Sequence, residues 1–117
     1  MQYMTIVKGS ENAGIPPKEL FDAIDQLMAK QAKSGIFVSA GGLKPTAQGA
    51  RVRITRGKLQ VSDGPFTEAK EVIGGFAILN AASKKEAIES AKEFMELHIQ
   101  HWPEWEGECE VREMEGP

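Results

Sequence analysis

The chain has 117 residues, 41% of them hydrophobic and 26% charged, and its net charge at pH 7 is −3. This length and balance indicate one ordinary globular domain, expected over residues 1–117, that can bury a core of its own. No apolar run reaches the ~20 residues of a membrane helix, and no secretory signal opens the sequence, so a membrane is not an expected partner. The single cysteine, Cys109, excludes an internal disulfide and is typical of a cytoplasmic protein.

Charge is unevenly distributed along the chain. Residues 1–60 hold nine Lys/Arg against four Asp/Glu, whereas residues 61–117 hold five against thirteen. The basic residues concentrate in segment 51–58 and the acidic ones in segment 104–115. Nucleic acid is not an expected partner, because a basic excess with interleaved aromatic side chains is missing. The two segments either form separate solvated faces or meet each other, within one chain or across a dimer.

The first third of the chain predicts a strand, a helix and a second strand. Residues 3–8 are β-rich and almost continuously apolar, which indicates a central strand. Pro17 favours the start of a helix that ends before Gly35, a residue suited to a left-handed cap. Residues 36–40 then predict the second strand. The helix is amphipathic, because apolar residues recur at its 3.6-residue period: Leu20, Phe21, Ile24, Leu27, Met28 and Ala32.

Residues 50–55 and 58–62 predict a β-hairpin around a tight turn at Arg56-Gly57. Polar and apolar residues alternate in both strands. Val52 and Ile54 are expected to point inward, and the second strand alternates in the same way through Leu59 and Val61.

The second half of the chain predicts a strand, a helix and a last strand. Residues 72–80 form an apolar strand, and residues 108–114 alternate as a strand does. Between them, Ser83 and Glu86 make a capping box that starts a helix running to about residue 100, which Pro103 ends. The expected buried face of this helix comprises Ala87, Ile88, Ala91, Phe94, Met95 and His98.

The order β-α-β, hairpin, β-α-β predicts an α+β fold. We expect a ferredoxin-like protomer in which two helices cover one face of a mainly antiparallel sheet. The other face of the sheet would then be open. Two copies of the chain would bury these faces together, so a homodimer is expected.

The motif Asp63-Gly64-Pro65-Phe66 follows the end of a predicted strand. Pro65 fixes its own φ and keeps Gly64 extended, so the carboxylate of Asp63 is held by a stiff backbone. Asp63 either accepts a backbone hydrogen bond that starts a turn or takes part in acid–base chemistry. Phe66 is expected to anchor the loop in the core.

The residues after the motif are charged and then glycine-rich. Glu68, Lys70 and Glu71 are expected to form surface ion pairs across the loop. Gly74-Gly75 inside a strand indicates a β-bulge, or the close approach of a ligand or a partner backbone.

The two histidines, His98 and His101, share a helix face because they are three residues apart. Two ligands are a weak metal signal, so no metal is expected. A histidine on an apolar helix face is more often hydrogen-bonded packing. General acid–base catalysis by either histidine, oriented by Asp63, is the alternative, and it is favoured over metal binding. Trp102 and Trp105 either wall a cleft or cover the end of the sheet. No phosphate-binding glycine motif or nucleophile elbow occurs, so no cofactor is expected.

Two blocks of the sequence resemble the DGPF-motif branch of the YCII-related family. The resemblance implies a dimeric α/β barrel of ferredoxin-like protomers. It also implies, for some members, a catalytic histidine on the first helix paired with an aspartate. The first helix here, Lys18–Lys33, contains no histidine, so that pair does not carry over. The first block is Asp63–Phe76. The second block runs from Leu97 to Arg112 and includes His98, His101, Trp102, Pro103 and Trp105.

Two functions follow from these patterns. The first is a dimeric ligand-binding or regulatory module. The resemblance favours this function, because proteins of the branch are associated with alternative sigma factors, which implies a functional link to such a factor. The second is a small-molecule enzyme of the acid–base lyase or hydrolase type that uses Asp63 with His98 or His101. Residues expected to contact a small-molecule ligand are Gly64, Pro65, Phe66, Glu68, Lys70 and Trp102.

Overall fold

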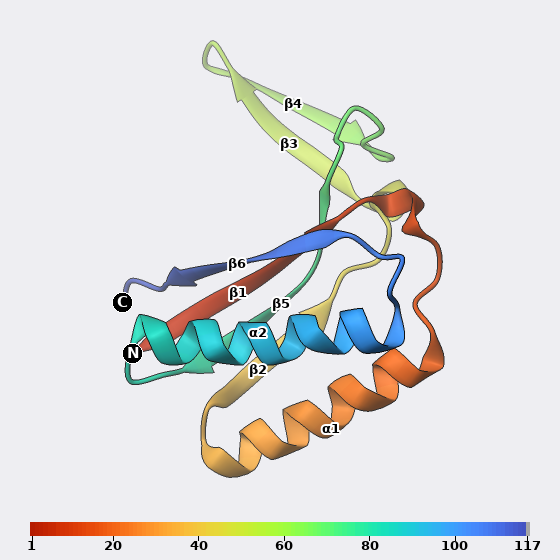
Figure 1. The fold of residues 1–117 in the computed structure, drawn as a ribbon. Coiled ribbons are helices and arrows are strands. Elements are labelled where there is room, and N and C mark those ends of the chain that lie inside the picture. The colour runs from red at the N-terminus through yellow and green to blue at the C-terminus, as the bar shows by residue number, and fades with distance from the viewer. Residues whose placement is uncertain (117) are drawn as a thin grey trace.

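The computed structural model describes residues 1–116, which form an α+β fold with two helices and antiparallel sheets (Figure 1). The predicted α+β class is confirmed, and the order of elements is compatible with a ferredoxin-like protomer. In chain order the elements are β1 (Gln2–Gly9), η1 (Glu11–Ala13), α1 (Lys18–Ser34), β2 (Phe37–Gly42), η2 (Thr46–Gln48), β3 (Ala50–Thr55), β4 (Lys58–Asp63), β5 (Val72–Asn80), α2 (Lys84–His101) and β6 (Gly107–Glu113).

Four strands form one antiparallel sheet in the order β2-β5-β1-β6, and both helices lie on one side of it (Figure 1). β1 pairs with β5 on one side and β6 on the other, as its continuous apolar run predicts. The register between β1 and β5 shifts between Val7 and Lys8, which leaves Gly74 without a partner on β1. The sequence indicated either a β-bulge or the close approach of a ligand or partner backbone at this position, and the structure shows a β-bulge.

The helix ends follow their local sequence. Gly35 ends α1 in the left-handed conformation, with φ 83°, and donates its N–H to the carbonyl of Ala32. Pro17 is the N-cap of α1 rather than its first helical residue. At the start of α2 the hydroxyl of Ser83 accepts a hydrogen bond of 3.2 Å from the backbone N–H of Glu86.

The fully buried core is small. Only Leu20 among the apolar residues of α1 is fully buried, although the helix has a continuous apolar stripe. The expected burial of Ile88 is wrong, because it is 37% exposed, and Phe21 on the apolar stripe of α1 is 52% exposed. Each lies about 100° around its helix from a buried neighbour, at the margin of the stripe. The densest part of the core lies between the sheet and α2, and comprises Tyr3, Ala81, Ala87 and Val111.

The β3-β4 hairpin is a separate two-stranded sheet that rises away from the four-stranded one (Figure 1). Its turn residues Arg56 and Gly57 both have positive φ, at 53° and 76°. The expected inward orientation of Val52 and Ile54 is wrong within the protomer, since they are 69% and 73% exposed. Alternation determines which side chains share a face, but it does not determine what covers that face.

The cap of α2 gives a stability prediction. Ser83→Ala removes the side-chain acceptor for the Glu86 N–H and is expected to lower the free energy of unfolding by about 1 kcal/mol. Ser83→Asp keeps an acceptor and should stay close to the wild type. Urea unfolding followed by circular dichroism measures both changes, and equal stability of all three proteins would contradict the capping role.

Candidate functional site

A cavity of about 690 Å³ lies between the two helices and the sheet face that they cover. The apolar stripe of α1 forms one wall of it, through Ile24, Leu27 and Met28. The cavity opens to solvent on the side where its lining residues Leu43 and Ile73 are 53% and 48% exposed. The stripe that predicted a packed core therefore lines a partly open space.

Glycines of β2 and β5 account for much of this space. A Cβ atom added at Gly42 or Gly74 would meet no other atom within 4 Å, so the backbone there borders empty volume. Gly75 is different, because its added Cβ would lie 3.0 Å from the carbonyl oxygen of Gly41. The glycines thus allow β2 and β5 to approach closely and leave the cavity wall free of side chains.

Aromatic rings close the cavity at the end of α2. The ring of His98 lies 4.7 Å from that of Trp105 and 4.8 Å from that of Phe94, measured between centroids. Trp102 stacks on Trp105 at 6.1 Å, and both indoles line the cavity. Trp105 rests against bare backbone, since a Cβ added at Gly9 would lie 3.0 Å from its ring. The two tryptophans therefore wall a cavity, one of the two roles that the sequence left open.

His98 is the titratable group most fully enclosed at this end. It is 7% exposed, and its Nδ1 lies 3.1 Å from the carbonyl oxygen of Phe94. A carbonyl only accepts, so Nδ1 carries the proton and Nε2 is left as an acceptor. Burial lowers the pKa of His98, outweighing the opposite effect of that hydrogen bond. A neutral imidazole at the cavity wall can accept a proton or a hydrogen bond from a small molecule.

A second polar group crosses the cavity. Gln31 of α1 is buried and donates a 2.7 Å hydrogen bond from Nε2 to the hydroxyl of Ser90 on α2. Both residues line the cavity, as does the buried Thr5 of β1. An apolar enclosure with a few fixed polar groups is the usual form of a small-molecule site.

The Asp63–Phe66 motif does not line the cavity but lies at the base of the β3-β4 hairpin. Asp63 is the last residue of β4 and pairs with Ala50, and the N–H of Gly64 donates to the carbonyl of Gly49 at 2.9 Å. The N–H of Phe66 donates to the hydroxyl of Thr46 at 3.0 Å. The motif therefore joins β4 to the η2 turn through its backbone.

Thr46 links this loop to the rim of the cavity. Its hydroxyl and its N–H both donate to the carboxylate of Glu11, each at 2.6 Å, and these two bonds lower the pKa of Glu11. Glu11 lines the cavity, whereas the motif residues do not. No local sequence pattern points to Thr46, because its hydrogen-bond partners lie 35 and 20 residues away.

The charged and aromatic residues near the motif interact with the hairpin. Glu68 forms an ion pair with Arg51 of the hairpin, and this contact lowers the pKa of Glu68. The expected ion pairs across the loop are wrong, because none of the described ion pairs includes Lys70 or Glu71. The guanidinium of Arg51 lies 3.8 Å from the centre of the Phe66 ring. Phe66 therefore packs at the base of the hairpin, and its expected place in the core is wrong.

The structure brings only two of the predicted site residues, His98 and Trp102, to the cavity. His101 is half-buried at the end of α2 and does not line it, and neither do Asp63, Gly64, Pro65, Glu68 or Lys70. Within residues 1–116 no hydrogen bond or ion pair joins Asp63 to either histidine. Their pairing across a dimer stays a prediction. The described residues also hold no cluster of three metal-ligating side chains and no helix able to span a membrane.

The fold and cavity define a small α+β protein with a helix-covered sheet and a partly open, mainly apolar cavity beneath the helices. The chain belongs to the YCII-related family, whose domain model matches residues 1–96. It is also similar to an uncharacterized protein of Rhizobium meliloti (strain 1021), with 33% identity over 70 residues. That similarity covers 60% of this chain and 56% of the relative, so the chain spans little more than half of the relative's length. The expected family is confirmed.

The close packing at Gly64 gives a second prediction. A Cβ added at Gly64 would overlap the carbonyl oxygen of Thr46, so Gly64→Ala is expected to destabilise the protein by about 1–3 kcal/mol. Gly74→Ala is the matched control, because its Cβ would meet no atom; its effect should stay within about 0.5 kcal/mol. Urea unfolding compares the two variants. Equal losses in the two variants would contradict the contact with Thr46 as the cause.

The buried imidazole gives a third prediction. Burial lowers the pKa of His98, whereas the unfolded chain titrates near the ordinary value of about 6.5. Between these two values the unfolded chain binds more protons, so the free energy of unfolding should rise with pH and level off above about 6.5. Urea unfolding across this range should show the rise in the wild type and in His101→Gln. His98→Asn should flatten it, and an unchanged slope in that variant would contradict the assignment.

Proposed function

We propose that this protein is a small-molecule-binding or regulatory module whose ligand occupies the cavity between the sheet and the helices. The cavity itself carries the proposal. A volume of about 690 Å³ lies in the range of sites for drug-sized molecules, and its lining is mainly apolar. His98, Thr5 and the Gln31–Ser90 pair supply the few polar groups that would orient a ligand.

The chemistry of the wall favours one class of ligand. An apolar or aromatic body suits the stripe of α1 and the rings of Trp102 and Trp105. A hydroxyl or N–H group on that body would donate to Nε2 of His98, whose other nitrogen is engaged by Phe94. The ligand class is therefore a compact aromatic or aliphatic molecule that carries one hydrogen-bond donor.

The proposed module is a cytoplasmic homodimer of the DGPF-motif branch. Apolar side chains on the sheet face away from the helices, including Met4, Ile6 and Ile78, are only half-buried and support pairing of two such faces. Pairing of this kind would give the dimeric α/β barrel that the resemblance implies. A functional link to an alternative sigma factor would make ligand binding regulatory.

Binding of two aromatic probes tests the proposed site. 2-Naphthol has an apolar body and a hydroxyl donor, while naphthalene lacks the donor. Titration of ¹⁵N-labelled protein should shift the amides that line the cavity saturably with 2-naphthol. Leu27→Trp, which fills the cavity, should abolish these shifts, and Ile99→Trp, at a 72% exposed position on α2, should preserve them. Saturable shifts that survive Leu27→Trp, or their absence in the wild type, would contradict the proposed site.

His98→Asn separates the hydrogen bond from the apolar contact. Loss of one neutral hydrogen bond, about 0.5–1.5 kcal/mol, should weaken 2-naphthol binding by roughly two- to tenfold. The affinity for naphthalene should change little, because that probe has no donor. Equal weakening of both probes would assign His98 a packing role only.

A further inference from the structure

The β3-β4 hairpin presents an apolar face that the protomer does not cover. Val52 lies opposite Val61 and Ile54 opposite Leu59, so the four side chains share one face. They are between 69% and 73% exposed. Single exposed apolar residues are common on proteins, but a contiguous set on a projecting element indicates an interaction surface. A two-stranded hairpin is also only marginally stable unless something packs against it.

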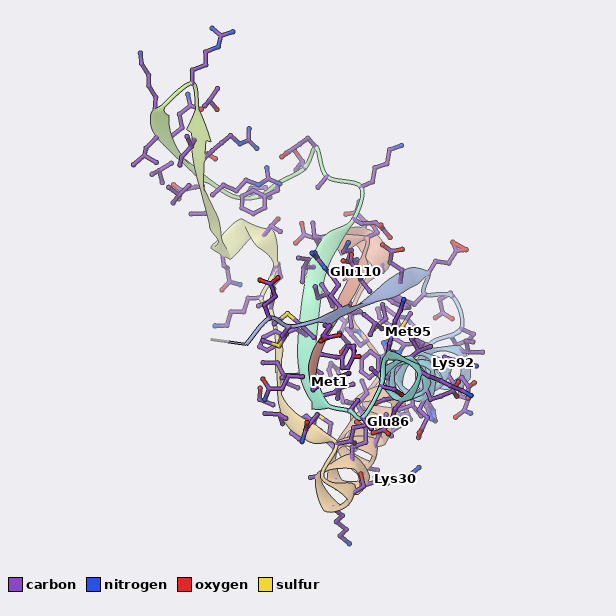
Figure 2. The ribbon with its side chains drawn as sticks, turned by 90° about the vertical axis from the view of Figure 1, so that its left-hand side faces the viewer. Met1, Lys30, Glu86, Lys92, Met95 and Glu110 are labelled. Atoms are coloured by element: carbon purple, nitrogen blue, oxygen red, sulfur yellow. The ribbon has the colours of Figure 1, made fainter. Side chains whose placement is uncertain are left out.

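The hairpin leans toward the side of the sheet that the helices leave open. In Figure 1 the hairpin rises above the sheet and lies farther from the viewer than the helices, and Figure 2 shows it on the opposite side from α2. The register places Met4 opposite Ile78 and Ile6 opposite Phe76, so these side chains form an apolar centre on that open sheet face. Two uncovered apolar surfaces thus lie on the same side of the molecule.

The charges on the two surfaces are complementary. Residues 50–62 contain four basic residues and no acidic one. On the open sheet face, the β6 residues Glu108, Glu110 and Arg112 lie opposite Lys8, Ile6 and Met4, and Arg112 pairs with Glu110. Residues 104–115 together contain six glutamates and one basic residue, so the border of the apolar centre along this segment is acidic overall. Lys8 pairs with Glu108 and Glu110 within the protomer. The opposite signs of hairpin and border favour their association.

Basic groups at the hairpin tip remain available for this association. Within residues 1–116, Arg51 is paired with Glu68, but no ion pair holds Arg53, Arg56 or Lys58. The hairpin and the acidic strand β6 form no ion pair with each other in the protomer. Among the residues that the structure describes, the charged tip therefore has no acidic partner.

We propose that the hairpin is an arm that reaches across the dimer and packs its apolar face against the β6 border of the open sheet face of a second copy of this chain, beside the area where the two sheet faces pair. Its basic tip, at Arg56 and Lys58, then lies beside the acidic β6 of that copy. The inference rests on the proposed homodimer and adds the element through which each copy holds the other. A two-fold axis makes the contact reciprocal, so each arm covers its partner and all four surfaces are buried at once.

A double substitution on the apolar face tests the arm. Ile54→Thr with Leu59→Thr removes one exposed cross-strand pair and keeps residues that suit a strand. Sedimentation equilibrium should show the dimer dissociation constant rising by at least about tenfold. The matched control, Gln60→Thr with Ser62→Thr, changes the other face of β4 and should leave the constant unchanged.

Charge exchange tests which partner surface the arm meets. Two variant proteins are prepared, one with Arg56→Glu and Lys58→Glu and the other with Glu108→Lys. Each variant alone should form a homodimer severalfold weaker than that of the wild type. Mixing the two variants should restore association as a heterodimer, which native mass spectrometry detects. Failure of the mixture to recover would overturn the placement of the tip beside β6.

An intermolecular measurement on the wild type avoids dependence on the variants. Equal mixing of ¹³C-labelled and unlabelled chains should give isotope-filtered NOEs from the Ile54 and Val61 methyls to the unlabelled copy. A dimer without these NOEs, and unaffected by the double threonine substitution, would overturn the arm and leave the proposed homodimer intact. A monomer at about 100 µM, a concentration far above the dissociation constants of specific dimers, would overturn both. Neither result bears on the probe titrations of the cavity.

Discussion

The arrangement on the helical side of the sheet depends on how closely β2 and β5 approach each other. The carbonyl of Gly41 would lie 3.0 Å from any Cβ at position 75, so a side chain there would force the two strands to shift. Gly42 and Gly74 leave the adjoining backbone bare. With no side chains rising from this part of the sheet, the apolar stripe of α1 faces a space it cannot fill. The cavity is thus bordered on the sheet side by the backbone of two closely packed neighbouring strands.

Features that depend on local sequence could be predicted. The left-handed cap at Gly35, the Ser83 cap, the positive-φ turn at Arg56-Gly57 and the alternation of the hairpin strands each arise from a few adjacent residues. The cavity could not be predicted, because an apolar stripe looks the same whether it meets side chains or glycine backbone. The exposure of Val52 and its neighbours was missed for a related reason. Alternation implies a covered face, but the covering surface need not belong to the same chain.

Sequence reasoning selected two residues that line the proposed cavity, and their contact with a ligand stays a prediction. His98 and Trp102 were found because a histidine on an apolar helix face beside tryptophans is conspicuous, and both line the cavity. The Asp63–Phe66 motif was expected to contact ligand, yet its backbone is occupied in joining β4 to the η2 turn. Gly64 accounts for this, since no other residue fits against the Thr46 carbonyl. A stiff, glycine- and proline-rich segment can therefore mark tight packing as readily as chemistry.

The aromatic wall of the cavity has a spectroscopic consequence. The chain contains two tryptophans, and both Trp102 and Trp105 border the cavity. Their intrinsic fluorescence therefore comes entirely from this region, with no background from indoles elsewhere in the chain. The imidazole of His98 lies 4.7 Å from the Trp105 ring, close enough for a protonated histidine to quench indole emission. The unlabelled protein thus carries an optical reporter of both the occupancy of its cavity and the charge of the histidine beside it.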